Sequence, residues 1–384
     1  MKIALLVQRF PHGGAERYTE QIARRLHAAG EDVTVVTSQN ESKDGYPFPV
    51  IRLPSRFSLG EYSLWKGLGQ VLQGKFDLVH TNSYGYFHSD YAAYRKRRYG
   101  YRLVMTGHGF AGVDLHELKK QGIAEPSKFG PVRPLYDSLV GRKTVLACDR
   151  LIALSERDVE YYQSCGVSLN KVTIIPPGID DSFFLPPTAD AANIRSNFDA
   201  DPLLLSVGEL SRVKAHATAI RAMPSIIQQN PKAKLVILGK DRTELESLSM
   251  LCRQLGVEKS VVFTGQKSEE EVRNCMHAAD LLVHTSLAEG LSTALLESMA
   301  CGLPFVTTPA GGNGHLARES GAGITIPFQD EKALAAAVTR LLGEGKEASE
   351  MKARARAFAS DLSWERLFPR IMNVYRSCME GRGK

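Results

Sequence analysis

Two carboxylates bracket the start of an expected helix in the second half of the chain. Residues 285–304 follow an apolar strand, and a helix is expected to begin at Ser292 or Thr293, both good N-cap residues. The free N–H groups and positive dipole end of such a start suit a diphosphate. Glu289 precedes this helix and Glu297 lies inside it. Because a phosphate would repel both carboxylates, we expect them to accept hydrogen bonds from hydroxyls on either side of it, one on a sugar and one on a ribose. The alternative is that one Glu caps the helix and the other is a solvated helix residue.

Two bases follow another expected strand, 203–207. The turn after it carries Gly208, Arg212 and Lys214. A diphosphate leaving group gains negative charge as its bond to a sugar breaks, and fixed cations there would stabilise the transition state more than the ground state. Exposed surface bases are the alternative.

The first half of the chain offers two glycine-flanked loops after strands. His108 lies between Gly107 and Gly109, where the backbone could approach a ligand closely and the imidazole could donate to a sugar hydroxyl or a developing charge; a histidine filling a turn is equally compatible. Gly13 and Gly14 separate a strand from a helix, preceded by His12. This junction is weaker than a full dinucleotide fingerprint and favours a tight loop facing phosphate or acceptor.

These loops must be positioned by alternating apolar strands and amphipathic helices, the pattern of parallel sheets wound with helices. The segment 183–201 is rich in Pro and Asp and predicts a domain boundary. We therefore expect an α/β protein with two Rossmann-like, doubly wound domains, 1–182 and 183–362, and a closing helix in 363–384 that could pack back on the first. Ligands in such folds bind outside the carboxyl ends of the strands, here in a cleft between the domains. The expected strands are 2–8, 33–37, 77–80, 102–106, 150–155, 172–175, 203–207, 234–238, 261–263, 281–284 and 304–307.

Composition agrees with a well-packed globular protein, with 43% hydrophobic and 23% charged residues among 384. No apolar run reaches the ~20 residues that span a bilayer, and the first residues lack a signal peptide, so a cytoplasmic protein is expected. The six cysteines are scattered, which argues against a zinc site and a disulfide framework and indicates buried thiols.

Positive charge is concentrated in one segment. Eleven bases and four acids lie between Arg95 and Lys143, whereas the formal net charge of the whole chain is +6. Tyrosines interleave with the bases Arg95, Lys96, Arg97 and Arg98, an arrangement suited to anionic lipid headgroups or a phosphorylated saccharide. A solvated basic helix is the alternative, and no nucleic-acid-binding module is recognisable.

Taken together, the motifs resemble the retaining glycosyltransferases of the GT-B fold, group 1, sequence family 4. The resemblance covers nearly the whole chain and rests on Ile175-Pro-Pro-Gly-Ile-Asp180, the Gly208 to Lys214 turn, Glu289 and Glu297 at the E-x7-E spacing, Gly302-Leu-Pro304, and Ser363-Trp-Glu365 with its helix.

The resemblance implies a role for each motif residue. Lys214 would bind the donor diphosphate, Glu297 the ribose and Glu289 the donor sugar. The amides at Ser292 and Thr293 would face the phosphates, and Leu291 would belong to the same donor-binding loop. His108 would face the donor sugar, and Gly14 the reaction centre. The nucleotide base would be read through backbone near Gly239, Gly265, Gln266 and Lys267. No metal or cofactor is implied, and the anomeric configuration would be retained.

Three positions depart from the family pattern. Glu209 stands where Arg is frequent, so Arg212 could supply the second positive charge and Glu209 is expected to point away. Ala215 follows Lys214, and His315 ends the motif in which the family usually has Gly-Gly-x-Pro-Glu. Other segments, among them Leu238-Gly-Lys-Asp-Arg242 and Gly314-His315, resemble the branch that glucosylates the lipopolysaccharide core, which implies UDP-glucose as donor, a lipid-linked or cell-envelope glycan as acceptor, and work at the inner membrane face.

Other activities remain open from the sequence. An inverting transferase or a sugar epimerase needs a positioned general base, for which His108 is the candidate. A non-catalytic glycan-binding relative is favoured by the three departures and disfavoured by the presence together of Lys214, Glu289 and Glu297.

Overall fold

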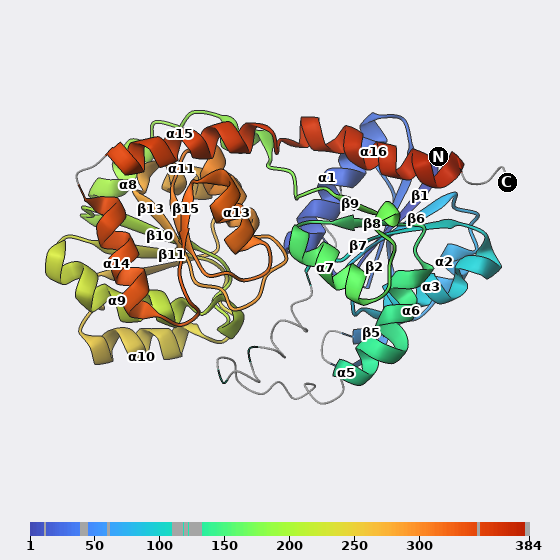
Figure 1. The fold of residues 1–384 in the computed structure, drawn as a ribbon, viewed down its shortest axis with the longest axis horizontal. Helices are drawn as coiled ribbons and strands as arrows, with labels where there is room; N and C mark the ends of the chain where they lie inside the picture. The colour runs from blue at the N-terminus through green and yellow to red at the C-terminus, as the bar shows by residue number, and fades with distance from the viewer. Residues whose placement is uncertain are drawn as a thin grey trace. The chain divides into compact units, whose positions relative to one another are not determined.

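The computed structural model describes residues 1–10, 13–38, 45–59, 62–109, 118, 122, 133–343 and 346–380. For residues 57–59, 133 and 192 only the backbone is described. These residues form two compact units (Figure 1). The first is built chiefly from 1–109, 133–178 and 364–380, and the second from 179–343 and 346–363. The expected boundary at 182/183 lies close to the observed division between 178 and 179.

The first unit contains, among the described residues, a seven-stranded parallel sheet in the order β3-β2-β1-β6-β7-β8-β9. Its central strands are buried on both faces: β1 is a continuous apolar run after Lys2, whereas β6 also buries His80, Thr81 and Asn82. The strands are β1 (Lys2–Val7), β2 (Asp32–Thr37), β3 (Val50–Arg52), β6 (Leu78–Asn82), β7 (Arg102–Thr106), β8 (Arg150–Ala153) and β9 (Val172–Ile174).

Helices connect these strands, and a small antiparallel pair, β4 (Ser55–Leu59) with β5 (Tyr62–Trp65), stands beside them. The helices are α1 (Gly14–Ala28), α2 (Leu68–Leu72), α3 (Phe87–Tyr99), α5 (Arg133–Tyr136), α6 (Arg142–Ala147) and α7 (Glu156–Ser164), with a π-helical turn η1 (Asp137–Gly141) and a 3-10 turn η2 (Leu169–Lys171).

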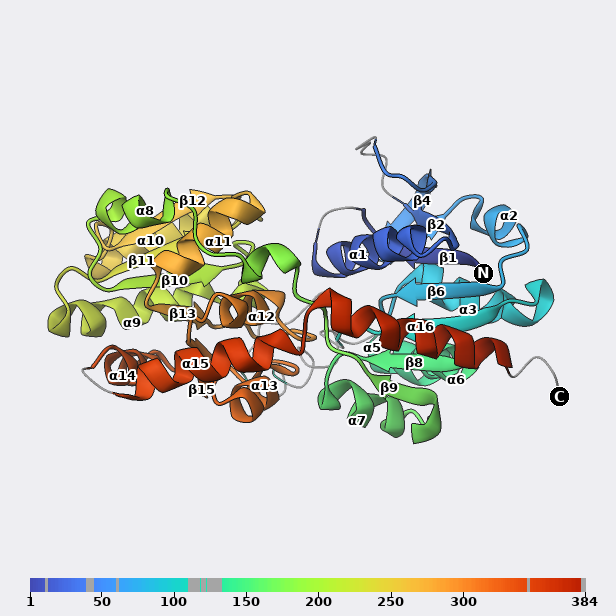
Figure 2. The ribbon, with the colours of Figure 1, turned by 90° about the horizontal axis from the view of Figure 1, so that it is seen from above.

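The last helix, α16 (Trp364–Glu380), belongs to the first unit and packs against α1 and β7 (Figure 2). The Trp364 ring lies 5.4 Å from that of Tyr18, measured between centroids. A Cβ at Gly178 would come within 2.3 Å of the indole, so only glycine lets the chain pass beneath it. Tyr375 also reaches the sheet, because its hydroxyl lies 2.6 Å from His80 Nδ1 in the buried interior.

The second unit contains, within its described part, a six-stranded parallel sheet in the order β12-β11-β10-β13-β14-β15. Its strands are β10 (Leu203–Val207), β11 (Lys234–Leu238), β12 (Val261–Gly265), β13 (Leu281–His284), β14 (Phe305–Thr307) and β15 (Gly323–Thr325). Its helices are η3 (Asp181–Phe184), α8 (Ala191–Phe198), η4 (Arg212–Lys214), α9 (His216–Gln229), α10 (Leu245–Leu255), α11 (Glu269–Ala278), α12 (Thr293–Ala300), α13 (Asn313–Ser320), α14 (Glu331–Leu342) and α15 (Lys346–Ser360).

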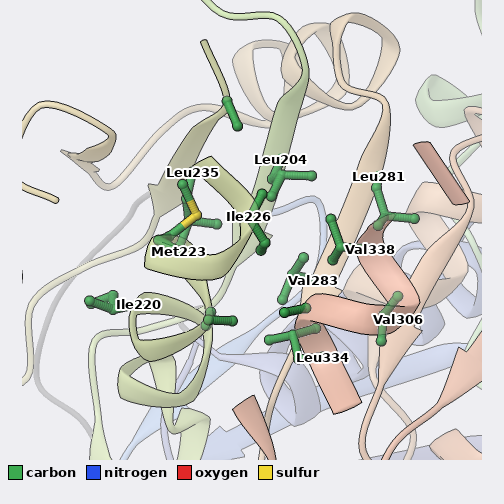
Figure 3. Close-up of a cluster of buried hydrophobic side chains, with 14 of the residues drawn as sticks. Leu204, Ile220, Met223, Ile226, Leu235, Leu281, Val283, Val306, Leu334 and Val338 are labelled. Atoms are coloured by element: carbon green, nitrogen blue, oxygen red, sulfur yellow. The ribbon is translucent and has the colours of Figure 1, made fainter. Parts of the chain in front are cut away.

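A hydrophobic core joins one face of this second sheet to α9, α10 and α14 (Figure 3). Leu204, Leu281 and Val306 come from the strands, while Ile226 and Val338 come from the helices. The apolar positions of α9 recur at helical spacing, so burying them against the sheet fixes the helix and, with it, the loop that precedes it.

Both sheets confirm the expected doubly wound α/β fold, and each expected strand is present within two residues at either end. The sequence prediction missed β3, β15 and the β4–β5 pair. The segments β3 and β15 have only three residues each and are only partly buried, so they lack the apolar run that marks the other strands. All six cysteines are buried free thiols, as predicted.

Candidate functional site

Each sheet has one point at which the strand order reverses, and the loops that follow its two central strands are neighbours there. In the second unit these strands are β10 and β13, which pair directly. The loop after β10 carries Arg212 and Lys214, and the loop after β13 carries Glu289. The topology thus brings together residues that are 75 positions apart in the chain.

Lys214 and Glu289 form an ion pair at this point. Lys214 Nζ donates to Glu289 Oε1 at 2.5 Å, and His284 Nε2 lies 3.0 Å from the same oxygen. Burial alone would raise the pKa of Glu289, but the Lys214 ammonium and the hydrogen bond from His284 outweigh it and hold that pKa well below its usual range. Glu289 is therefore ionised across the physiological range.

The geometry leaves one carboxylate oxygen of Glu289 for a ligand. Both protein donors converge on Oε1, and Oε2 accepts no hydrogen bond from the described residues. The side chain of Glu289 is 13% exposed and that of Lys214 is 26% exposed, so the pair is partly open to solvent. Oε2 is therefore the oxygen of Glu289 that could accept a hydrogen bond from a ligand.

Three further bonds tie the two loops together. The Leu287 amide donates to the Val213 carbonyl at 2.7 Å. The Thr285 hydroxyl is placed to donate to the carbonyls of Lys214 and Ala215, at 3.2 and 3.0 Å. This clamp explains how an alanine is accommodated at 215 with a left-handed φ of 48°, a conformation that favours Gly or Asn.

Two glycines let these loops pack closely. The methylenes of Lys214 lie over Gly208, where a Cβ would be 3.4 Å from Lys214 Cδ. A Cβ at Gly239, the residue after β11, would lie 1.9 Å from the Gly208 carbonyl oxygen, which no side chain could tolerate. The sequence predicts that Gly239 helps to bind the nucleotide base. The structure shows that Gly239 is half-buried and that the close packing of the two loops requires glycine there.

The other two charged residues of the Lys214 loop, Arg212 and Glu209, pair with residues outside the loop. Arg212 is 73% exposed and lies 3.5 Å from Glu244. The carboxylate of Glu209 is held by Arg242 at 2.7 Å. The unfavourable acid in this loop is thus neutralised by a neighbour, and Lys214 is the more enclosed of the two candidate cations.

Helix α12 begins after the Glu289 loop. The Ser292 amide donates to Asn313 Oδ1 at 3.0 Å, so one of the amides expected to face phosphate already has an acceptor. The amides of Thr293 and Ala294 donate to no atom of the described chain. Glu297 is buried one turn further on, and Leu291 is half-buried. Gly265 at the end of β12 and the following Gln266 and Lys267 are exposed, with Lys267 paired to Glu271 at 2.8 Å.

In the first unit, His108 follows β7 with a left-handed φ of 54°, a conformation that costs about 1–2 kcal/mol and is often found at functional sites. Its Nε2 lies 3.3 Å from Asn82 Oδ1, and the Tyr18 ring lies edge-on at 4.7 Å between centroids. Burial lowers the pKa of His108 to about 3, so the imidazole is neutral at physiological pH and donates through Nε2.

Gly13 and Gly14 lie at the start of α1, and His12 falls outside the described residues. Gly13 has a φ of 111°, and a Cβ there would strike the Glu16 carboxylate. Gly14 is exposed, and a Cβ there would meet no described atom within 4 Å. Its open side is therefore available to a ligand.

The basic side chains of α3 lie in different surroundings. Lys96 turns inward, with Nζ 2.7 Å from the Ala147 carbonyl oxygen and 2.9 Å from Asp149. Arg95 lies over the rings of Tyr91 and Tyr94. Arg97 and Arg98 remain exposed on α3. Of the other bases in the segment, Lys119, Lys120 and Lys128 fall outside the described residues.

Sequence reasoning did not find two residues of the site. His284 contacts Glu289, and Asn313 binds the Ser292 amide. His284 ends an apolar strand, and a polar residue at the carboxyl end of a buried strand was the available signal. Among the residues that the structure describes, no group of three or more His, Cys, Asp or Glu side chains could hold a metal ion.

Two doubly wound parallel units with this pair of loops define the GT-B class of proteins. Two family models divide the chain between them: Glycosyltransferase Family 4 over residues 12–183 and Glycosyl transferases group 1 over residues 190–358. A D-inositol 3-phosphate glycosyltransferase from Thermomonospora curvata is 30% identical over 403 residues, covering 94% of this chain and 90% of that protein. A protein of the same name from Acidothermus cellulolyticus is 27% identical, covering 96% and 87%.

Solved structures have the same fold. HepE from Anabaena in complex with UDP and glucose has a TM-score of 0.79 at 21% identity, covering 98% of this chain and 100% of that one. WaaG, a glycosyltransferase involved in lipopolysaccharide biosynthesis, has a TM-score of 0.72 at 21% identity, covering all of both chains. The chain belongs to the group 1, family 4 glycosyltransferases, and it is an enzyme of this retaining, nucleotide-sugar-dependent class.

Proposed function

We propose that the chain transfers a hexose from a nucleotide diphosphate sugar, UDP-glucose or a close relative, either to a lipid-linked or cell-envelope glycan or to a small phosphorylated polyol. The observation that carries this proposal is the pairing of Lys214 with Glu289 where the second sheet reverses its strand order. A cation for the leaving diphosphate and an acceptor for a sugar hydroxyl stand side by side there.

The chemistry of departure follows from these side chains. As the glycosidic bond breaks, negative charge grows on the diphosphate. The Lys214 ammonium and the free amides of Thr293 and Ala294 are fixed donors for it, so they stabilise the transition state more than the ground state. Glu289 Oε2 accepts from a sugar hydroxyl, and Glu297 is proposed to accept from the ribose.

The state of His108 bears on the alternatives left open by the sequence. An inverting transferase or an epimerase needs a general base whose pKa lies near the working pH. Burial lowers the pKa of His108 to about 3, which makes the imidazole a weak base. Its Nε2–H already donates to Asn82 Oδ1, so the proposed contact with a sugar hydroxyl would use Nδ1 as an acceptor.

Two acceptor classes have support. The curated relatives named above are D-inositol 3-phosphate glycosyltransferases, which favours a small phosphorylated polyol. The lipopolysaccharide core is favoured by the motifs of the last half of the chain and by the fold of WaaG. Work at the inner membrane face belongs to this second proposal. In the described part of the chain, no helix combines the length and the apolar character needed to cross a bilayer.

Transfer assays separate these possibilities. Radiolabelled UDP-glucose is supplied with D-inositol 3-phosphate, with delipidated lipopolysaccharide core, or without acceptor, and the product anomer is assigned by NMR. The proposal predicts a product with the donor's anomeric configuration, and loss of that product in Lys214→Ala and Glu297→Ala. An inverted product, or full turnover by either variant, would contradict it.

A further inference from the structure

Two loops of the second unit run side by side beyond the carboxyl end of its sheet. They are the β13 loop, residues 285–292, which carries Glu289, and the β14 loop, residues 308–312. The loops start next to each other because β13 and β14 pair in parallel. The Thr308 hydroxyl of the β14 loop donates to the Ser286 carbonyl of the β13 loop, and both residues are buried. The β14 loop therefore holds the first part of the β13 loop.

Glycines bring the middle parts of the two loops into backbone contact. The Gly312 amide donates to the Gly290 carbonyl at 2.8 Å. A Cβ at Gly311 would overlap the carbonyl oxygens of Glu289 and Gly290. Glycine at 311 therefore lets the β14 loop pack directly against the backbone of Glu289.

Asn313 holds the end of the β13 loop. This first residue of α13 is fully buried, and its Oδ1 accepts a hydrogen bond from the Ser292 amide at 3.0 Å. An N–H group can bond only to the oxygen of a carboxamide, so this contact fixes the orientation of the side chain. Its Nδ2 has no acceptor among the residues that the structure describes. The protein thus uses the oxygen of this side chain, which an aspartate would also provide.

Glu289 is consequently held from two sides. The loop after β10 binds its side chain, through the contact of Lys214 with Oε1. The β14 loop packs against its backbone and binds the β13 loop before and after it. The direction of Oε2 follows from both sets of contacts, and Oε2 is the oxygen proposed to accept from a sugar hydroxyl.

We infer that the β14 loop determines which sugar the site accepts, with Asn313 as the positioning residue. Hexose epimers differ only in the direction of one hydroxyl group, so an acceptor distinguishes them only if its own position is fixed. A site built to bond a hydroxyl rejects a sugar that leaves the enclosed acceptor unpaired. This inference rests on the sugar contact proposed for Glu289, and it adds that a second layer of residues behind that contact controls its selectivity.

His315, which departs from the family pattern in this region, is paired along α13 instead. Its ring lies 3.1 Å from Glu319 and 2.9 Å from Arg318, and both of these residues are exposed. The contacts to the β13 loop are made by residues 308–313, so they are present in spite of the departure. His315 therefore offers a control two residues away from Asn313.

The test compares two donors, UDP-glucose and UDP-galactose, which share the diphosphate and differ in the configuration of one hydroxyl. Asn313→Leu removes the acceptor of the Ser292 amide with little change in volume. We expect the ratio of kcat/KM for the two donors to move towards one. For the preferred donor kcat/KM should fall by up to about 10²-fold, because a displacement of about 1 Å can cost that factor. The dissociation constant of UDP alone, which lacks the sugar, should change by a smaller factor.

Conservative and matched variants separate positioning from a general loss of stability. Asn313→Asp retains the acceptor and should retain the native ratio, since its added charge acts equally on two donors with the same diphosphate. Gly311→Ala displaces the Glu289 backbone and should change the ratio as Asn313→Leu does, whereas His315→Ala should leave it native. A merely destabilised protein would lose turnover of both donors equally. A native ratio in both Asn313→Leu and Gly311→Ala would therefore overturn the inference.

Hydrogen exchange tests the positioning role independently of turnover. The amides of residues 286–292 should exchange faster in Asn313→Leu than in the native chain, and at the native rate in Asn313→Asp. Equal exchange in all three proteins would contradict the role of Asn313. A native chain that uses neither donor, yet shows the expected exchange, would count against the proposed donor and not against the positioning of the β13 loop.

Discussion

Replacing Lys214 by alanine tests the central assignment. The substitution removes the ammonium that lies 2.5 Å from Glu289 Oε1 and leaves an enclosed carboxylate with His284 as its remaining donor. Breaking one partner of a fully buried pair costs about 3–5 kcal/mol. Because the side chain of Lys214 is 26% exposed, water can replace part of the ammonium, and we expect a loss of about 1–3 kcal/mol in the free energy of unfolding.

The effect on catalysis should be larger than the effect on folding. Removing one fixed donor from the developing charge lowers kcat about 10²–10³-fold in well-studied cases. Turnover of UDP-glucose is measured by release of UDP, and urea unfolding gives the stability of the same samples. Arg221→Ala is the matched control, because Arg221 is exposed on α9, outside the two loops of the site, and should change both quantities little.

A second substitution separates the structural from the catalytic role. In the double variant K214A/E289Q the uncompensated carboxylate is gone, so stability should recover towards that of the native chain. Turnover should not recover, because neither the cation nor the ionised acceptor is present. If Lys214→Ala retains turnover within about threefold of native while it stays folded, Lys214 does not stabilise the leaving group, and the reasoning from transition-state charge fails.

Three further outcomes are expected. Gly14→Ala should fold normally, since a Cβ there meets no described atom within 4 Å and alanine favours helix more than glycine does. It should lower kcat/KM, because the added methyl group would occupy the space proposed for the ligand. Native kinetics would place the ligand elsewhere. His284→Leu should lower kcat at nearly constant KM for the nucleotide, because Glu289 loses a positioning donor, while His284→Gln should restore part of the rate; equal rates in the two variants would exclude this role. Burial lowers the pKa of His80 and of His88 to about 3, so the unfolded chain binds more protons below its histidine pKa near 6.5. The free energy of unfolding from urea titrations should therefore fall between pH 6.5 and 5.5, by up to about 1.4 kcal/mol per pH unit for each histidine, and a flat profile there would refute the assignment.

Local sequence patterns predict most of the strands and helices of this protein. Largely apolar runs such as Leu203–Val207 predict buried parallel strands, and the helical periodicity between them predicts helices that cover both faces. The same local patterns place Lys214 and Glu289 on loops at the carboxyl ends of strands. The segments β3 and β15 escape prediction because three partly buried residues carry no pattern.

Tertiary structure alone decided which of these residues meet. The pairing of β10 with β13 joins Lys214 to Glu289, and no local pattern encodes strand order. It also showed that some candidate ligand-binding groups already have partners within the protein. Asn313 accepts from the Ser292 amide, and Asp149 pairs with Lys96. The physical reason is that propensity and periodicity act between neighbours in the chain, whereas burial, ion pairing and pKa depend on the residues that folding brings into contact from far along it.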